Sequence, residues 1–448
     1  MMPKFLAILN TIQLHFYEIK YGGCSVFFRK ILSVCNRTLS LLIIILSGPL
    51  VLIIVLLRPL VWLRFGVIDS QRIGHFTGEV EAYLCHRENE KLNHRIMDIV
   101  GCIEPVCNKQ LLSMWKRVMR ITPGWKLWKF FDKACIFWTR GEKHHARLYN
   151  VGSAYRLLSD TEPHLFFTNE EIQKGRELLN QLGIPPDASW ICIHNRDAAY
   201  LEKSYPDNNW SYHNYRDFSI QSMMLASEEL AERGYYVLRM GSIVAEKVKS
   251  LNPKIIDYSS SELQTDFADI YLGARCIAYI GSDSGIASVP LIFHKPFCYI
   301  NYSLTLLKIL LNQNRCYLFI TKRLWHRGNN KLLSLREIFE LGLTGASDSQ
   351  LFEKAGVVWI SNTSIEIYEL AIELDERLNG RWLAESDDEA LQYRFWATFA
   401  RYSTDNVSFE HVKSRIGAVF LRKNIDLLDD IGSACFSKHR IKDYIYDA

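Results

Sequence analysis

Short apolar segments alternate with helix-like segments between residues 190 and 302, and this alternation restricts the fold more than any other feature of the sequence. Near-continuous apolar strands joined by helices are typical of a parallel sheet with helices on both faces. The expected helices cover residues 219–233 and 265–275. The expected strands are WICIHN (190–195), YYVLRMG (235–241), KIIDYS (254–259), CIAYI (276–280) and KPFCYINY (295–302). The sequence therefore predicts an α/β fold with a doubly wound parallel sheet.

The chain is long enough for more than one domain, because 448 residues exceed what one ordinary hydrophobic core holds. A helix that Gly183 ends, with two prolines after it, marks the clearest boundary. A later helix opens with a capping box formed by Thr363 and Glu366. We expect a membrane-anchoring region (1–63), an N-terminal α/β domain (64–184), a C-terminal α/β domain (185–362) and a helical region that packs back on the N-terminal domain (363–448).

The composition excludes some classes of protein. A net charge of +4 is small for this length and does not indicate a nucleic-acid partner. The eleven cysteines form no CxxC pair and no Cys/His cluster at zinc spacing, so they predict neither a disulfide framework nor a structural metal. Cys192, Cys276 and Cys298 lie within apolar segments, which favours buried, reduced thiols and a reducing compartment.

The segment from Thr38 to Leu57 carries no charge, and its length matches the ~20 residues of a membrane-spanning helix. Basic residues flank it on both sides, so the charge distribution does not determine its orientation. Gly48 and Pro49 allow a kinked or re-entrant course. Five Asn-x-Ser/Thr triplets would suit a lumenal enzyme, although such triplets also arise by chance. Because of the cysteines, we expect an inner-membrane protein with its catalytic domains in the cytoplasm.

Unusual residues follow three of the expected strands. The carboxyl ends of parallel strands meet at one edge of a sheet, where ligands bind. Two arginines and the start of a helix at this edge would suit a diphosphate, because guanidinium groups and free N–H groups both bind phosphate oxygens. The residues are His194, Arg196 and Asp197 at the end of the first strand, Arg239 and Gly241 at the end of the second, and Ser282, Asp283, Ser284 and Gly285 after the fourth.

Each of these features also has a purely structural interpretation. Arg196 and Asp197 could form a surface ion pair, and Arg239 could extend to solvent. The loop from residue 282 to residue 285 could be an ordinary turn with its serine and aspartate as helix caps. The sequence contains no P-loop and no GxGxxG dinucleotide fingerprint. It also contains no Asp-x-Asp triplet, so it does not predict a Mg²⁺- or Mn²⁺-dependent sugar-nucleotide site of that kind.

Several segments together resemble a bacterial family of glycosyltransferases that is associated with surface-polysaccharide clusters. The resemblance is strong from residue 185 to residue 305 and weaker at RIGHF (72–76) and after VVWISNTS (357–364). HNRD (194–197) is remotely similar to the HxR motif of fucosyltransferases, and GSDSG (281–285) to the donor-site loop of heptosyltransferases. The chain departs from both patterns, with a single arginine after His194 and with Pro290 in the following helix. The segments that carry the resemblance are ICIHNRDAAYL, WSYHNYRDFSI, LAERGYYVLRMGS, KIIDYSS, DFADIYLGARCIAYIGSDSG and FHKPFCYINY.

The resemblance implies a GT-B architecture, in which two Rossmann-like domains face each other and the C-terminal one holds a nucleotide-sugar without a metal or other cofactor. It implies a membrane-anchored transferase that extends a surface glycan, such as lipopolysaccharide or capsule, or a lipid-linked acceptor. In this hypothesis Arg196, Arg239 and the N–H groups at Ser284 and Gly285 stabilise the departing diphosphate. His75, with Glu79 one turn later, is the candidate base, although a structural histidine is the alternative.

Two other functions are compatible with these residues. A sugar-nucleotide epimerase can share the architecture but would need carboxylates that face the sugar. A catalytically inactive, membrane-anchored scaffold could bind nucleotide or glycan. The sequence leaves open the donor, the acceptor, the linkage, the stereochemical outcome and the oligomeric state.

Overall fold

The computed structural model describes residues 26–28, 30–36, 38–89, 95–141, 143–148, 157–158, 160–307, 310, 317–403, 409 and 411–428. Residues 1–25 of the expected membrane-anchoring region and residues 429–448 of the expected C-terminal region lie outside the described residues. The chain divides into two compact units. Unit 1 comprises Met1–Val67, Leu92–Cys102 and Arg120–Arg147, and unit 2 comprises Ile68–Lys91, Ile103–Met119 and Leu148–Ala448.

Unit 2 contains a sheet of seven strands in the order β12-β8-β7-β6-β3-β4-β5, and its paired strands are parallel. The chain enters at β3, adds β4 and β5 on one side, and then crosses to β6, β7 and β8 on the other. This order is that of a Rossmann fold, and it confirms the predicted parallel α/β sheet. The strands are β3 (Trp190–His194), β4 (Tyr236–Arg239), β5 (Ile255–Ile256), β6 (Ala278–Gly281), β7 (Phe297–Tyr302), β8 (Leu318–Thr321) and β12 (Arg415–Ile416).

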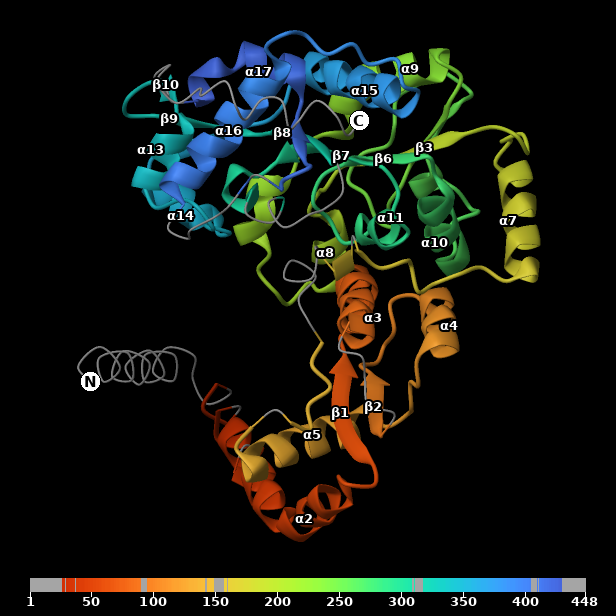
Figure 1. The fold of residues 1–448 in the computed structure, drawn as a ribbon, viewed down its shortest axis with the longest axis vertical. Helices are drawn as coiled ribbons and strands as arrows, with labels where there is room; N and C mark the ends of the chain where they lie inside the picture. The colour runs from red at the N-terminus through yellow and green to blue at the C-terminus, as the bar shows by residue number, and fades with distance from the viewer. Residues whose placement is uncertain are drawn as a thin grey trace. The chain divides into compact units, whose positions relative to one another are not determined.

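Helices cover both faces of this sheet, as the unbroken apolar strands predict. Ile191, Cys192 and Ile193 of β3 are each at most 1% exposed. Helices α9 (Met224–Glu232) and α15 (Ser364–Leu378) lie above the sheet in Figure 1, and α10 (Asp266–Arg275) and α11 (Ser288–Ile292) lie below it. A parallel strand that is buried on two faces has no solvent side, so its sequence shows no polar alternation.

Helix α15 begins with the predicted capping box, since Glu366 N–H donates to Thr363 Oγ1 at 3.2 Å. It contacts α9, β7 and β8. We expected the region after residue 363 to pack on the N-terminal domain, and the structure places α15 on the large sheet instead. The reason is the apolar side of the helix, whose Ile367, Leu370 and Leu374 are buried in unit 2.

The segment 64–184, which we expected to be a Rossmann-like domain, is divided between the two units. Its described strands β1 (Trp62–Ile68) and β2 (Ile96–Cys102) form a sheet of two strands. The π-helix η1 (His75–Glu79) between them and α4 (Lys109–Val118) after them belong to unit 2, where α4 contacts α10 and η1 contacts α11. His75 and Glu79 therefore lie in the same unit as the large sheet.

The remaining elements of unit 2 complete its helical layers and a small antiparallel sheet of order β10-β9-β11. They are α3 (Val80–Asn89), α7 (Asn169–Gln181), α8 (Ala199–Ser204), α13 (Leu335–Glu340), α14 (Ser349–Lys354), α16 (Asp388–Tyr402), α17 (Ala418–Lys423), β9 (Arg323–His326), β10 (Lys331–Leu332), β11 (Val357–Ile360) and the 3-10 helices η2 (Ser211–Arg216), η3 (Ile220–Met223), η4 (Tyr258–Ser260), η5 (Leu304–Leu306) and η6 (Ile425–Leu427).

Unit 1 packs α2 (Gly48–Leu57) and α5 (Trp125–Thr139) beside the two-stranded sheet. An ion pair joins the strands, with Arg64 Nε 2.6 Å from Asp98 Oδ1. The core of this unit contains Val51, Ile54, Phe65, Ala134 and Cys135.

Within the described residues, no single helix is long and apolar enough to cross a membrane. The helical segments Val26–Leu46 and Gly48–Leu57 meet the requirement only as a pair, and they are bent by 47° relative to each other. A straight span from Thr38 to Leu57 is therefore not present. The break falls at Ser47, directly before the Gly48-Pro49 pair at which the sequence allows a kink.

Candidate functional site

A cavity of about 520 Å³ lies in unit 2 at the carboxyl ends of β3, β4 and β6. The strand order reverses between β3 and β6, and ligands of Rossmann-type sheets bind in the crevice at that reversal. Arg239 and Ser282 do not line the cavity, although we expected both to contact a ligand. The predicted residues that do line it are His75, Glu79, His194, Arg196, Asp197, Gly241, Asp283, Ser284 and Gly285.

Two glycines bring the segment around His75 into contact with the loop after β6. A Cβ atom on Gly74 would lie 3.0 Å from Gly285 Cα, and one on Gly285 would lie 3.2 Å from Ile73 Cγ2. A side chain at either position would therefore push the two backbones apart. His75 precedes the last residue of β3, His194, by 119 residues. The close approach of the two backbones explains how His75 and the segment HNRD (194–197) line the same cavity.

Replacing Gly74 with valine is expected to lower the free energy of unfolding by about 1–3 kcal/mol, because the added atoms overpack a contact between two backbones. Chemical denaturation of the purified protein measures this change. Gly141→Val is the matched control, because a Cβ there meets only Thr139 O, at 3.9 Å. Equal stability of the two variants would show that the Gly74–Gly285 contact is absent.

His75 and Glu79 form a pair within η1. The Nδ1 atom of His75 lies 2.6 Å from Glu79 Oε1. This hydrogen bond raises the pKa of His75 above its ordinary value, despite the opposing effect of burial. The His75 side chain is 35% exposed, so the imidazole remains open to a substrate hydroxyl. A histidine supported by a carboxylate is the arrangement of a general base.

Arg196 is buried at 7% exposure and anchors the loop that contains η2. Its Nη1 donates to His213 O at 3.2 Å and to the carboxylate of Asp217. Lys322 supports the same loop, because its Nζ donates to Asp217 O at 2.7 Å. Burial lowers the pKa of Lys322 to about 8. Arg196 thus contributes a cation held in place at the cavity wall.

Arg239 has a different position from the one we expected. Its side chain is fully buried, and Nη2 donates to Asn195 Oδ1 at 3.0 Å while Nη1 donates to Asp257 and Ser259. Arg239 is the last residue of β4, paired with Ile193 of β3, and its polar partners at the strand ends enclose the guanidinium. Arg239 therefore holds Asn195 and Asp257 together and does not line the cavity.

Asp197 and His194 also position the cavity wall. Asp197 accepts the N–H groups of Ala199 at 3.1 Å and Ala245 at 3.0 Å, which joins the loops after β3 and β4. Burial, together with the nearby guanidinium groups of Arg239 and Arg196, lowers the pKa of His194 to about 3. The imidazole is therefore neutral at physiological pH, and its Nδ1 lies 3.2 Å from Ser284 Oγ.

The loop after β6 does not open directly into a helix. Helix α11 starts at Ser288 and has five residues, with Pro290 inside it. Its dipole is too short to supply the positive helix end that we expected at Ser284 and Gly285. Turns occupy this stretch, with Ala287 N–H donating to Ser284 O at 3.2 Å. Among the described residues, no backbone carbonyl accepts the N–H groups of Ser284, Gly285 or Ile286.

Sequence reasoning missed Arg72 as a site residue. Arg72 lines the cavity, and its guanidinium carbon lies 5.8 Å from the centre of the Trp210 ring. Arg196 is paired with Asp217 and Arg216 with Asp283, whereas no carboxylate of the described residues pairs with Arg72. The available signal was its place in RIGHF (72–76), three residues before His75.

Comparisons with known proteins give a remote similarity. No protein-family model and no curated protein matches the chain. E. coli ADP-heptose LPS heptosyltransferase II is 16% identical over 53% of this chain and 84% of that chain, with a TM-score of 0.31. A glycosyl transferase family 9 structure from Veillonella parvula is 11% identical over 54% and 80%, with a TM-score of 0.31. The iron-containing dodecameric glycosyltransferase TibC from enterotoxigenic E. coli is 10% identical over 53% and 58%, with a TM-score of 0.26. Similarity at this level does not identify the activity of the chain.

Proposed function

We propose that unit 2 is a glycosyltransferase that moves a sugar from a nucleotide-sugar to an acceptor hydroxyl. The observation that carries this proposal is the set of groups that line the cavity between β3 and β6, where the strand order reverses. It holds a histidine-carboxylate pair, the guanidinium groups of Arg72 and Arg196, and backbone N–H groups without backbone acceptors. Cations and N–H donors are suited to a diphosphate, and the histidine is suited to a hydroxyl.

The proposed reaction breaks the bond between the sugar C1 and the diphosphate oxygen and forms a bond from C1 to the acceptor oxygen. The acceptor proton passes to His75, and the Glu79 carboxylate stabilises the imidazolium that results. Negative charge grows on the departing nucleoside diphosphate. Arg72, Arg196 and the N–H groups of Ser284 to Ile286 stabilise that charge, so the proposal requires no metal ion.

Incubation of the purified protein with a panel of nucleotide-sugars and lipid-linked or glycan acceptors tests the proposal. Release of nucleoside diphosphate together with a glycosylated product supports transfer. An epimerised donor without release would indicate the epimerase, and binding without any reaction in the presence of acceptor would indicate the scaffold. Either of these two results contradicts the proposal.

Glu79→Gln is expected to move the acidic limb of the pH dependence of kcat/KM to lower pH. The carboxylate raises the pKa of His75, so its removal lowers that pKa, and the neutral base persists at lower pH. A pH series of initial rates measures this shift. A limb that does not move, or that moves to higher pH, would exclude His75 as the titrating base.

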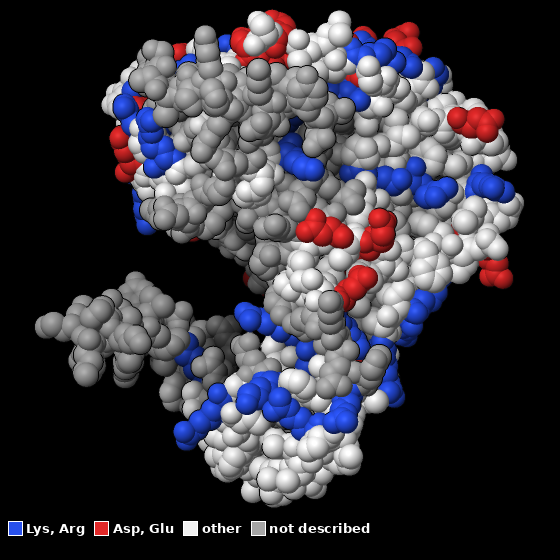
Figure 2. Space-filling model, in the orientation of Figure 1, with Lys and Arg blue, Asp and Glu red and all other residues white. Residues whose placement is uncertain are grey.

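We further propose that unit 1 binds the cytoplasmic face of the inner membrane, where a lipid-linked acceptor would lie. Figure 2 shows uncharged surface along the lower margin of the part that contains α2 and α5, with Lys and Arg residues beside it. The α2 residues Leu52, Ile53 and Leu56 are more than half exposed. On α5, Lys126, Lys129 and Lys133 are exposed and recur at helical spacing. An apolar surface beside basic residues is the pattern of an interfacial membrane site.

Replacing Lys126, Lys129 and Lys133 with glutamine is expected to weaken binding to phosphatidylserine-containing vesicles by about 100-fold, since each lysine near an anionic surface contributes ~1 kcal/mol. Vesicle sedimentation measures the affinity. Glutamine at Lys174, Lys203 and Lys354 of unit 2 is the control, because it removes the same charge from exposed positions elsewhere. Equal binding of the two triple variants would contradict the membrane site.

A further inference from the structure

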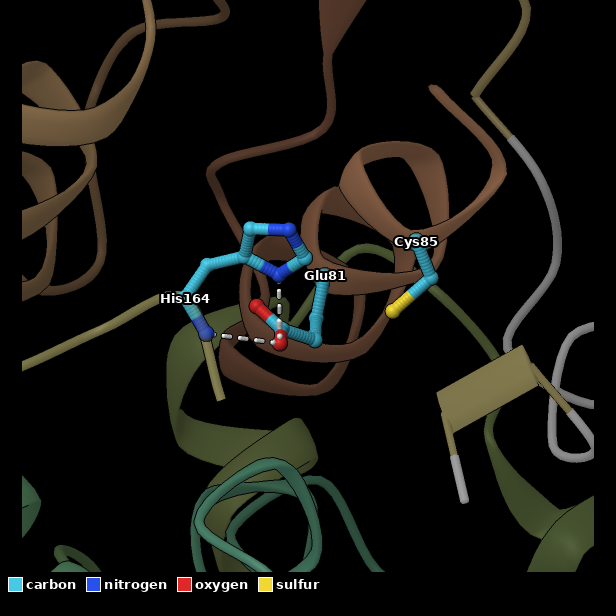
Figure 3. A group of neighbouring side chains, drawn as sticks. All are labelled: Glu81, Cys85 and His164. Carbon is cyan, nitrogen blue, oxygen red and sulfur yellow. Dashed lines mark hydrogen bonds and ion pairs between the residues drawn. The ribbon is translucent and has the colours of Figure 1, made fainter. Parts of the chain in front are cut away.

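A second group of chemically reactive side chains lies in unit 2, outside the cavity at the carboxyl ends of β3, β4 and β6. Glu81 and Cys85 are one turn apart on α3, and His164 comes from the segment before α7 (Figure 3). His164 Nδ1 lies 2.9 Å from Glu81 Oε1, which also accepts the His164 backbone N–H at 3.1 Å. One ligand atom from each of the three residues lies within 4.8 Å of the other two.

This group contains a buried polar atom without a partner. Glu81 is 1% exposed and Cys85 is fully buried. The Oε2 atom of Glu81 accepts no hydrogen bond from the residues that the structure describes. A carboxylate oxygen buried without a donor is costly, and a bound cation would remove that cost.

The second ring nitrogen of His164, Nε2, lies near a carboxylate, as it does in many metal-binding histidines. His164 Nε2 lies 3.4 Å from Glu88 Oε2, and this leaves Nδ1 toward Glu81. Metal-binding histidines commonly donate the other ring N–H to a carboxylate, which fixes the tautomer and the ring orientation.

We propose that Glu81, Cys85 and His164 bind a zinc ion. A thiolate, an imidazole and a carboxylate are zinc ligands, whereas magnesium and calcium prefer oxygen alone. Zinc–ligand bonds of about 2.0–2.3 Å at tetrahedral angles separate the ligand atoms by about 3.3–3.8 Å. Side-chain shifts of under about 1 Å would bring the three atoms to these separations. Binding converts the Cys85 thiol to a thiolate and releases its proton to solvent.

The site would fix the helix that presents the proposed base. Helix α3 follows η1 directly, so His75 and Glu79 precede Glu81 in one helical segment. A zinc ion would join this segment to the chain at His164, 83 residues later. Its role is structural, and because none of the three ligands lines the cavity, the zinc site and the transfer activity can fail independently.

Titration of the chelator-treated protein with Co²⁺ alone tests the site, because a cobalt-bound thiolate gives a charge-transfer absorption band. We expect a band that saturates at one equivalent and is displaced by Zn²⁺. Cys85→Ser should abolish the band, and Glu81→Gln should weaken cobalt binding at least about 10-fold. Cys102→Ser, a half-buried thiol of unit 1, should leave it unchanged.

Circular dichroism measures whether each variant is folded. If Cys85→Ser does not fold, the cobalt affinity of Glu81→Gln decides the outcome. A folded wild-type protein without the band would overturn the proposal. So would a band that Cys85→Ser leaves intact, or cobalt affinity that Glu81→Gln does not change.

Discussion

His75→Ala should lower kcat for sugar transfer by about 10²–10⁴-fold, the usual contribution of a positioned general base. The affinity for the nucleotide-sugar should stay close to that of the wild type, since the imidazole acts on the acceptor. Steady-state kinetics with a saturating donor, together with donor binding by calorimetry, separates the two quantities. The hydrogen bond that the ring donates to the Glu79 carboxylate and the exposure of the ring are the reasons for assigning this role to His75.

The control for His75→Ala is His411→Ala, which truncates an exposed histidine outside the cavity lining. It should retain full activity. If His75→Ala turns over at the wild-type rate, the base is another group, and the arrangement around Glu79 is structural. If donor binding falls as much as kcat, His75 contacts the donor instead.

Arg72→Ala is expected to lower kcat/KM by about 10²–10³-fold, which is the loss that follows removal of one preorganised donor to a developing negative charge. Arg72 is favoured over the other cavity arginines because it has no carboxylate partner among the described residues. Arg72→Lys should recover part of the activity, since it keeps the charge but not the forked donors. Initial rates across donor concentrations measure both variants.

Arg275→Ala is the matched control, because Arg275 is an exposed arginine at the end of α10 and does not line the cavity. It removes the same charge and should leave the rate unchanged. A loss of the same size in both variants would mean that Arg72 acts only through the net charge of unit 2.

The large sheet could be predicted from the sequence because its strands are unbroken apolar segments between helices with clear ends. Burial on both faces imposes that pattern on β3, β6 and β7. The capping box at Thr363 is a local signal and was also found. The fate of segment 64–184 depends on contacts over long separations, such as the hydrogen bond from Asn108 to Asp266 O at 2.9 Å. No local pattern reports such contacts.

Part of the candidate site could also be predicted, because it lies at the ends of the predicted strands. Strand ends place Arg196, Asp283 and Ser284 at one edge, as parallel pairing requires. The sequence predicts that Arg239 contacts the ligand, but the residue is fully buried and does not line the cavity, because the direction of a side chain at a strand end depends on tertiary contacts. The group of Glu81, Cys85 and His164 could not be predicted from the sequence, because Glu81 and His164 are far apart in sequence and do not follow a zinc-finger spacing.

Calorimetric titration with UDP, GDP, ADP and CDP, without added divalent cation, is the decisive measurement. One of these nucleotides should bind with one site per chain, more weakly as salt is added and more weakly still to Arg72→Ala. A folded protein that binds none of the four, or an Arg72→Ala variant that binds as tightly as the wild type, would contradict a diphosphate in this cavity.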